Sequence, residues 1–131
     1  MTPQQIRMLA YAVAAARVGI GTAAILTPGL AMRIWLGADP HSSKVKAMAM
    51  AIGARDIALG VGTLQALGDG RNPAVWLKVG ALADAADGLG TLRALRRTSS
   101  PRILIGFIAG GVAAASWLAG SRLEETGRGS A

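Results

Sequence analysis

The chain has 131 residues, of which 52% are hydrophobic, 16% are charged and none is cysteine. This length fits one domain, and the lack of cysteine excludes a disulfide scaffold and a thiolate metal site. His41 is the single histidine, so a histidine metal cluster is excluded as well, and we expect no metal and no cofactor. The low charge and the long apolar stretches are untypical of a soluble enzyme. They predict one all-α integral membrane domain over residues 1–131.

The net charge of +7 raises the question of nucleic-acid binding. Such binding needs basic residues gathered on one solvated face, often with aromatic side chains on which bases stack. Here the basic residues are scattered between apolar segments, and the few aromatic residues form no such platform. We therefore expect no nucleic-acid partner and attribute the charge to the loops of a membrane protein.

Four segments, at residues 8–26, 45–67, 74–92 and 103–121, have the length and apolar content of membrane-spanning helices. Loop-like residues separate them: Pro28-Gly29 after the first, residues 68–73 after the second, and residues 98–101 before the fourth. The sequence thus predicts a four-helix bundle with both termini on the same side of the membrane. The tail at residues 124–131 is expected to be flexible.

Two stretches near the N-terminus leave alternatives open. Residues 30–36 are too few to span a membrane and form either a short helix in the membrane interface or an ordinary loop. The first apolar segment also resembles a cleaved signal peptide, but Arg17 falls in its middle, which favours a retained helix.

The positions of lysine and arginine predict the orientation. The first and third loops hold seven of these residues and the terminus side holds five. We therefore expect residues 27–44 and 93–102 in the cytoplasm and the protein in the bacterial inner membrane.

Charged residues interrupt three of the four segments near their midpoints, and this is the most informative feature of the sequence. The five residues concerned are Arg17, Arg55, Asp56, Asp84 and Asp87. An aspartate or arginine at a helix centre costs about 2.5–3.5 kcal/mol on an insertion scale. The second segment holds two such charges, and its apolar residues offset only about 2–4 kcal/mol of their insertion cost. We therefore expect these five groups to face inward and pair with one another.

Two arginines against three aspartates leave one surplus negative charge. A carboxyl group must then hold a proton, for which Asp84 and Asp87 are the natural pair, or a cation must enter. The other reading is that the charges only fix how the helices pack. Both readings stay open at this point.

Small residues predict where helices approach closely. We expect Gly53, Gly60 and Gly88 to pack helices beside the charges, and Gly106 and Gly110 to form a GxxxG face on the fourth segment. The second and third segments also echo each other at a shift of 28 residues, which aligns Asp56 with Asp84. This echo is either an inverted repeat or a chance match between alanine- and glycine-rich stretches.

The run Gly53-Ala54-Arg55-Asp56-Ile57-Ala58-Leu59-Gly60, followed by Ala83-Asp84-Ala85-Ala86-Asp87, resembles a family of small integral membrane proteins common in actinobacteria. That family has a G-x-R-D-x-x-L-G signature and is grouped as a domain of unknown function. The resemblance implies a four-helix membrane protein and no established activity, so it implies no catalytic residues.

Three functions are compatible with these features. We expect a non-enzymatic membrane component that associates with itself or with another membrane protein, and whose Arg/Asp network fixes bundle packing. The alternative is an oligomeric transporter, or a proton or cation pathway, that uses the midplane aspartates. An intramembrane aspartyl protease fits poorly, because Asp84 and Asp87 lie on one helix, and no nucleophile with a nearby base is visible.

Overall fold

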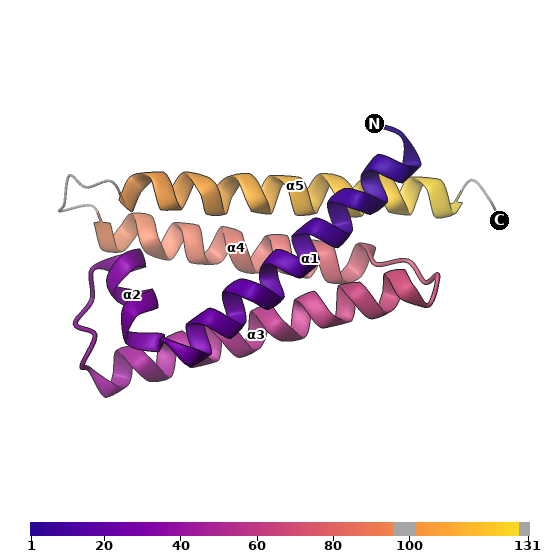
Figure 1. The fold of residues 1–131 in the computed structure, drawn as a ribbon. Coiled ribbons are helices and arrows are strands. Elements are labelled where there is room, and N and C mark those ends of the chain that lie inside the picture. The colour runs from indigo at the N-terminus through magenta and orange to yellow at the C-terminus, as the bar shows by residue number, and fades with distance from the viewer. Residues whose placement is uncertain (96–101, 129–131) are drawn as a thin grey trace.

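The computed structural model describes the backbone of residues 1–95 and 102–128, and the side chains of residues 1–93 and 111–125. Within these ranges every regular element is an α-helix, which confirms the all-α prediction. Figure 1 shows the five helices: α1 (Pro3–Leu26), α2 (Pro28–Leu36), α3 (Ser43–Gly68), α4 (Ala74–Leu95) and α5 (Arg102–Arg128).

Local signals explain where the helices begin and end. The Thr2 side chain caps the start of α1 in a capping box with Gln5, and Ser42 caps the start of α3. Residues 30–36, for which the sequence left two alternatives, belong to the helix α2. It starts at Pro28 and ends at Gly37, which adopts the left-handed conformation that glycine tolerates, with φ 65°.

The four long helices form two antiparallel hairpins (Figure 1). The closest packing is α1 against α3 and α4 against α5, whereas the contacts between the two hairpins are sparser. The short α2 lies at the end of the bundle where α1 ends, and it contacts both hairpins. The start of α1 and the end of α5 lie at the opposite end.

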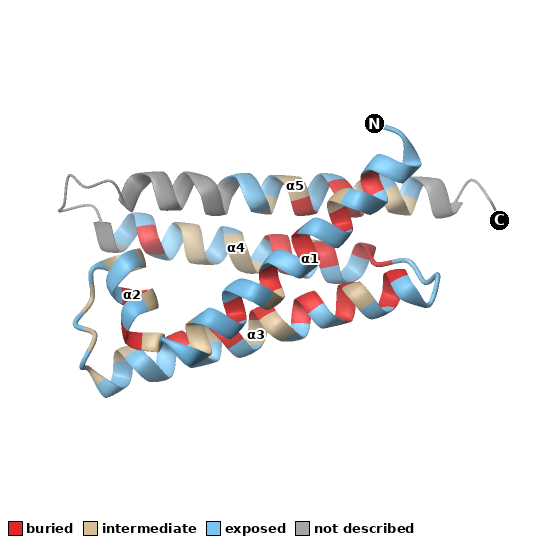
Figure 2. Cartoon of the chain, viewed as in Figure 1, coloured by how far each residue is buried: buried red, intermediate tan, exposed pale blue. Residues whose placement is uncertain are grey.

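Buried residues lie mainly where the helices face one another, and exposed residues cover the outer faces (Figure 2). Arg17 and Asp56 are buried, while the described parts of all five helices carry exposed large apolar side chains. They include Met8, Ile20, Leu26, Ile34, Met48, Val75, Leu82, Leu89 and Leu118.

Two of the helices, α1 and α3, are long and apolar enough to cross a membrane. That finding covers only the described residues. α4 has a similar length but contains the charged residues Lys78, Asp84 and Asp87. The finding gives weak support to a membrane location.

The final helix is longer than the sequence predicted. It continues to Arg128, so residues 124–128, which we expected in a flexible tail, are helical. Glu124 anchors this turn, because its carboxylate lies 2.6 Å from Nζ of Lys78 on α4. Residues 129–131 lie outside the described part of the chain.

Candidate functional site

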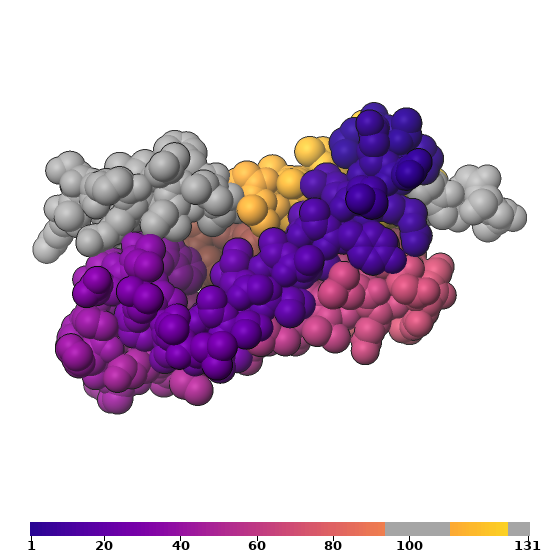
Figure 3. Space-filling view, viewed as in Figure 1, coloured from indigo at the N-terminus to yellow at the C-terminus, as the bar shows by residue number. Residues whose placement is uncertain are grey.

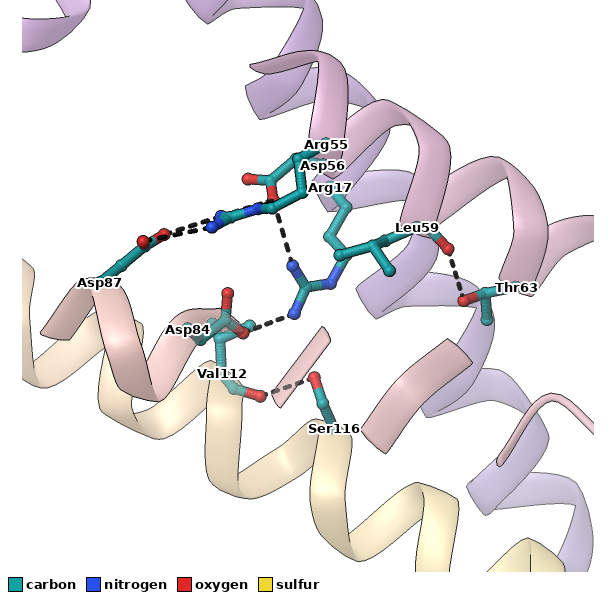
Figure 4. Close-up of polar contacts among 9 residues, drawn as sticks. All are labelled: Arg17, Arg55, Asp56, Leu59, Thr63, Asp84, Asp87, Val112 and Ser116. Carbon is teal, nitrogen blue, oxygen red and sulfur yellow. Dashed lines mark hydrogen bonds and ion pairs between the residues drawn. The ribbon is translucent and has the colours of Figure 1, made fainter. Parts of the chain in front are cut away.

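The structure brings together all five charged residues that the sequence placed at one depth (Figure 4). Arg17 comes from α1, Arg55 and Asp56 from α3, and Asp84 and Asp87 from α4. Arg17 is 5% exposed and Asp56 is 8% exposed. Arg17 and Asp56 thus lie inside the bundle, whereas the side chains of Arg55 and Asp87 are 30% and 21% exposed.

Arg17 joins the two aspartates that the internal echo aligns. Its Nη1 lies 3.5 Å from Oδ1 of Asp56, and its Nη2 lies 2.5 Å from Oδ2 of Asp84. A planar guanidinium suits this task because its two Nη groups can serve two carboxylates at once. Arg17 thereby connects α1 to its own hairpin partner α3 and to α4 of the other hairpin.

Arg55 makes the second connection between the hairpins. Its Nη1 and Nη2 donate to the two carboxylate oxygens of Asp87 at 3.2 and 2.7 Å, a bidentate pair. Its Nε and Nη2 also donate to Oδ1 of the adjacent Asp56, at 3.1 and 2.9 Å. On an ideal helix adjacent residues point about 100° apart, yet the long arginine side chain reaches back to its neighbour and outward to α4.

The five groups form one alternating chain in the order Asp84, Arg17, Asp56, Arg55, Asp87. Asp84 and Asp87, the expected proton-sharing pair, bind different arginines. Among the described residues no hydrogen bond joins them to each other. Asp87 uses both oxygens on Arg55, whereas Oδ1 of Asp84 accepts no hydrogen bond from the described residues. The chain thus ends on two carboxylates, and one of them keeps a free oxygen.

Glycines allow the helices that hold these charges to approach closely. A Cβ added to Gly53 would lie 2.6 Å from the carbonyl oxygen of Gly21, and one added to Gly60 would lie 2.7 Å from that of Ala14. The sequence placed both Gly53 and Gly60 at helix contacts, and the structure has them there.

Gly88 has no described atom within 4 Å of an added Cβ, so the described residues show no close helix contact there. Gly106 and Gly110 fall in the part of α5 whose side chains are outside the described residues.

Two contacts at the site were not predicted. Gly80 faces the Arg17 guanidinium, and an added Cβ would lie 2.7 Å from Nη2. Trp35 donates from Nε1 to Oγ1 of Thr91 at 3.1 Å and so docks α2 on α4.

The buried hydroxyl groups near the ion-pair chain donate to backbone carbonyls of their own helices. Thr63 donates to the carbonyl of Leu59 and Ser116 to that of Val112, both at 2.8 Å. Every buried polar side-chain atom in the described residues has a partner. The described residues also contain no group of three metal-ligating side chains. The arrangement can hold charges and helices in place, and it offers no activated nucleophile among the described hydroxyls.

A cavity of about 290 Å³ lies beside the ion-pair chain, between the two hairpins. Its walls are mostly aliphatic, and Arg17, Asp56, Asp84 and Asp87 line its inner side. Figure 3 shows the hollow on this face, bordered by α1 and α2 with α4 at its floor. The charged groups are therefore reachable from one side of the bundle.

Comparison with known proteins does not assign the chain to a family. No family model matches it, and neither a curated protein nor a solved structure resembles it significantly.

Proposed function

We propose that the chain is an integral membrane protein whose helices α1, α3, α4 and α5 cross the bilayer as a four-helix bundle. The supporting observation is that ion pairs join the two hairpins on the inside while all five helices carry exposed large apolar side chains. An apolar exterior of this extent promotes association in water, whereas it is the ordinary exterior of a bundle in lipid. The short α2, with exposed Arg33 and Ile34, lies in the membrane interface.

The ion pairs explain how α4 enters lipid in this proposal. Two aspartates near a helix centre cost about 5–7 kcal/mol on an insertion scale, more than the apolar residues of α4 offset. Arg17 and Arg55 supply the counter-charges from the other hairpin. α4 is then accommodated as part of the assembled bundle.

The role that these contacts favour is non-enzymatic: the Arg/Asp chain fixes how the two hairpins pack. Arg17 of α1 and Arg55 of α3 bind aspartates of α4, while the remaining contacts between hairpins are sparse. Ion pairs of this kind select one arrangement of helices, because any other leaves a buried charge without a partner. The expected partners are the bilayer and a second copy or another membrane protein.

The location follows the charge bias of the loops. We place the protein in a bacterial inner membrane, with residues 27–44 and 93–102 in the cytoplasm and both termini on the other side. The resemblance to small actinobacterial membrane proteins stays a prediction.

A second candidate function is an oligomeric transporter or a proton or cation pathway. The cavity favours it, because it gives the midplane aspartates an opening toward one side of the bundle. Four spans are few for a monomeric transporter, so this candidate requires a dimer or a larger assembly.

Neutral variants of the α4 aspartates test the packing role. We expect Asp84→Asn and Asp87→Asn each to lower the free energy of unfolding in detergent by about 1–3 kcal/mol, because each removes the charge that holds α4 to an arginine of the other hairpin, while that arginine keeps Asp56. Asp69→Asn is the matched control, since Asp69 is 60% exposed in its pair with Arg71. If the α4 variants fold as well as the parent, the carboxylates do not serve packing, and the transport candidate takes first place.

A further inference from the structure

We propose that the cavity between the hairpins binds an organic cation with a single positive charge on an apolar body. This inference rests on the membrane location proposed above. It names the chemical class of ligand that the cavity and the ion-pair chain recognise together.

The walls of the cavity select an apolar body. Val13 and Ile20 of α1, Ile52 of α3 and Val112 of α5 line it with aliphatic groups, and Trp35 adds an aromatic ring. Ligand pockets of small molecules span roughly 300–1,000 Å³, so a cavity of 290 Å³ suits a compact molecule. Such walls offer few hydrogen bonds to replace those that a strongly hydrated ligand would lose with its water.

The inner side of the cavity selects a positive charge. All three aspartates of the ion-pair chain line the cavity, but only one of the two arginines, Arg17, does so. Arg17 already binds Asp56 and Asp84. The charge chain as a whole holds one more carboxylate than guanidinium, so a bound monocation would bring it to neutrality.

The geometry also offers the cation a place. Oδ1 of Asp84 accepts no hydrogen bond from the described residues, while its Oδ2 is held by Arg17. Asp84 therefore presents an oxygen that its arginine does not occupy, and its position is fixed by that same arginine. Trp35 lines the cavity as well, and aromatic rings attract organic ammonium groups.

Other ligands fit the same cavity less well. A small inorganic cation must replace its hydration shell with about six oxygen ligands, and the described lining supplies oxygens only from three carboxylates already engaged by arginines. An anion would meet the surplus negative charge. A neutral molecule would fill the cavity and contact its apolar walls, but it would leave the surplus negative charge of the ion-pair chain uncompensated.

The test uses benzyltrimethylammonium and its neutral isostere neopentylbenzene, which differ in one atom, nitrogen or carbon. Binding is measured by equilibrium dialysis against phosphatidylcholine nanodiscs, with and without the full chain, so that partitioning into lipid is subtracted. We expect saturable, protein-dependent binding of the cation, about tenfold tighter than that of the isostere.

Three variants locate the site. Asp84→Asn should weaken cation binding about tenfold without affecting the isostere. Because that variant also disturbs packing, Ala16→Leu provides a second test: Ala16 lines the cavity and is exposed, so a larger side chain fills the space and leaves the ion pairs in place. Ala15→Leu is the matched control, at an exposed position outside the cavity lining. We expect Ala16→Leu to abolish binding of both probes and Ala15→Leu to retain it.

The outcomes separate this inference from the proposal on which it rests. Equal affinity for the cation and its isostere, or no protein-dependent binding by a folded chain in nanodiscs, overturns the cation site and leaves the membrane bundle standing. Binding that survives Ala16→Leu also overturns it, because the ligand would then lie elsewhere. A chain that stays folded and monodisperse in water and does not enter nanodiscs overturns the membrane proposal itself.

Discussion

Gly21 of α1 and Gly53 of α3 lie face to face: a Cβ on either would come 2.5–2.6 Å from the other's carbonyl oxygen. Gly21 lies one turn beyond Arg17, and Gly53 lies about one turn before Asp56. The two backbones therefore approach most closely beside the ion pair between these helices. Close packing and charge pairing are coupled here, because Arg17 reaches Asp56 only when α1 and α3 are near each other.

Gly53→Ala should force α1 and α3 apart. The methyl group would meet backbone atoms, which cannot rotate away as a side chain can, so we expect a loss of about 1–3 kcal/mol in the free energy of unfolding. The measurement is denaturant unfolding in detergent followed by circular dichroism.

Gly19→Ala is the control for this substitution. Gly19 lies on α1 two residues from Gly21 but has nothing within 4 Å of an added Cβ. Alanine favours helix over glycine by about 0.5–1 kcal/mol, so this variant should be unchanged or slightly more stable. Equal effects at residues 19 and 53 would contradict the close approach of the two helices.

Arg17→Leu should be among the most damaging single substitutions. It leaves Asp84 without its arginine and Asp56 with Arg55 alone, and breaking a buried pair costs about 3–5 kcal/mol. Arg17→Lys should recover only part of this loss. Lysine keeps the positive charge, but its single compact ammonium group lacks the two separate Nη groups with which Arg17 binds two carboxylates. Unfolding in detergent measures both variants.

The exposed pair of Arg71 and Asp69 provides the comparison for Arg17. Arg71 is 69% exposed in that pair, and exposed ion pairs contribute about 0–1 kcal/mol. Arg71→Leu should therefore lie within about 1 kcal/mol of the parent. If Arg17→Leu were equally mild, the ion-pair chain would have no part in holding the hairpins together.

The helices and the depth of the charges were predictable from the sequence for a simple physical reason. A spanning helix needs a run of apolar residues, and a charge within that run is conspicuous and must find a partner. Arg17, Asp56 and Asp84 could therefore be placed in one buried group before any geometry was known.

The pairing within that group could not be predicted. Arginine has a long side chain, so Arg55 could reach several carboxylates, and only the rotation of each helix decides which it meets. Gly80 shows the same limit: its role against Arg17 depends on how α4 is turned, and a glycine in a glycine-rich chain gives no signal of its own. Gly88 has no described atom within 4 Å of an added Cβ, and its expected packing role stays a prediction.

Trp35 and Thr91 should be energetically coupled. The indole Nε1 donates to Oγ1 of Thr91, whose hydroxyl donates in turn to the carbonyl of Asp87, so the contact docks α2 beside the ion-pair chain. Trp35→Phe and Thr91→Val each remove one partner of the hydrogen bond. We expect a coupling energy of about 0.5–1.5 kcal/mol in a double-mutant cycle of unfolding. Strictly additive effects would mean that the bond does not stabilise the position of α2.

Leu82 and Val75 distinguish a bundle in lipid from one in water. Both lie on α4 and are exposed, at 62% and 67%, so in water an arginine at either position would be tolerated. In a bilayer the two positions differ, because Leu82 is near the middle of the helix and Val75 is near its start, where an arginine side chain can extend to the interface.

Leu82→Arg should therefore reduce membrane insertion while Val75→Arg should not. An arginine at a helix centre costs about 2.5–3.5 kcal/mol on an insertion scale, which lowers the inserted fraction by roughly two orders of magnitude at equilibrium. The measurement is the fraction of full-length chain that stays with carbonate-washed membranes after expression. Equal recovery of the two variants would show that the exposed apolar face of α4 does not meet lipid, because only the low dielectric of a bilayer makes the depth of a charge matter.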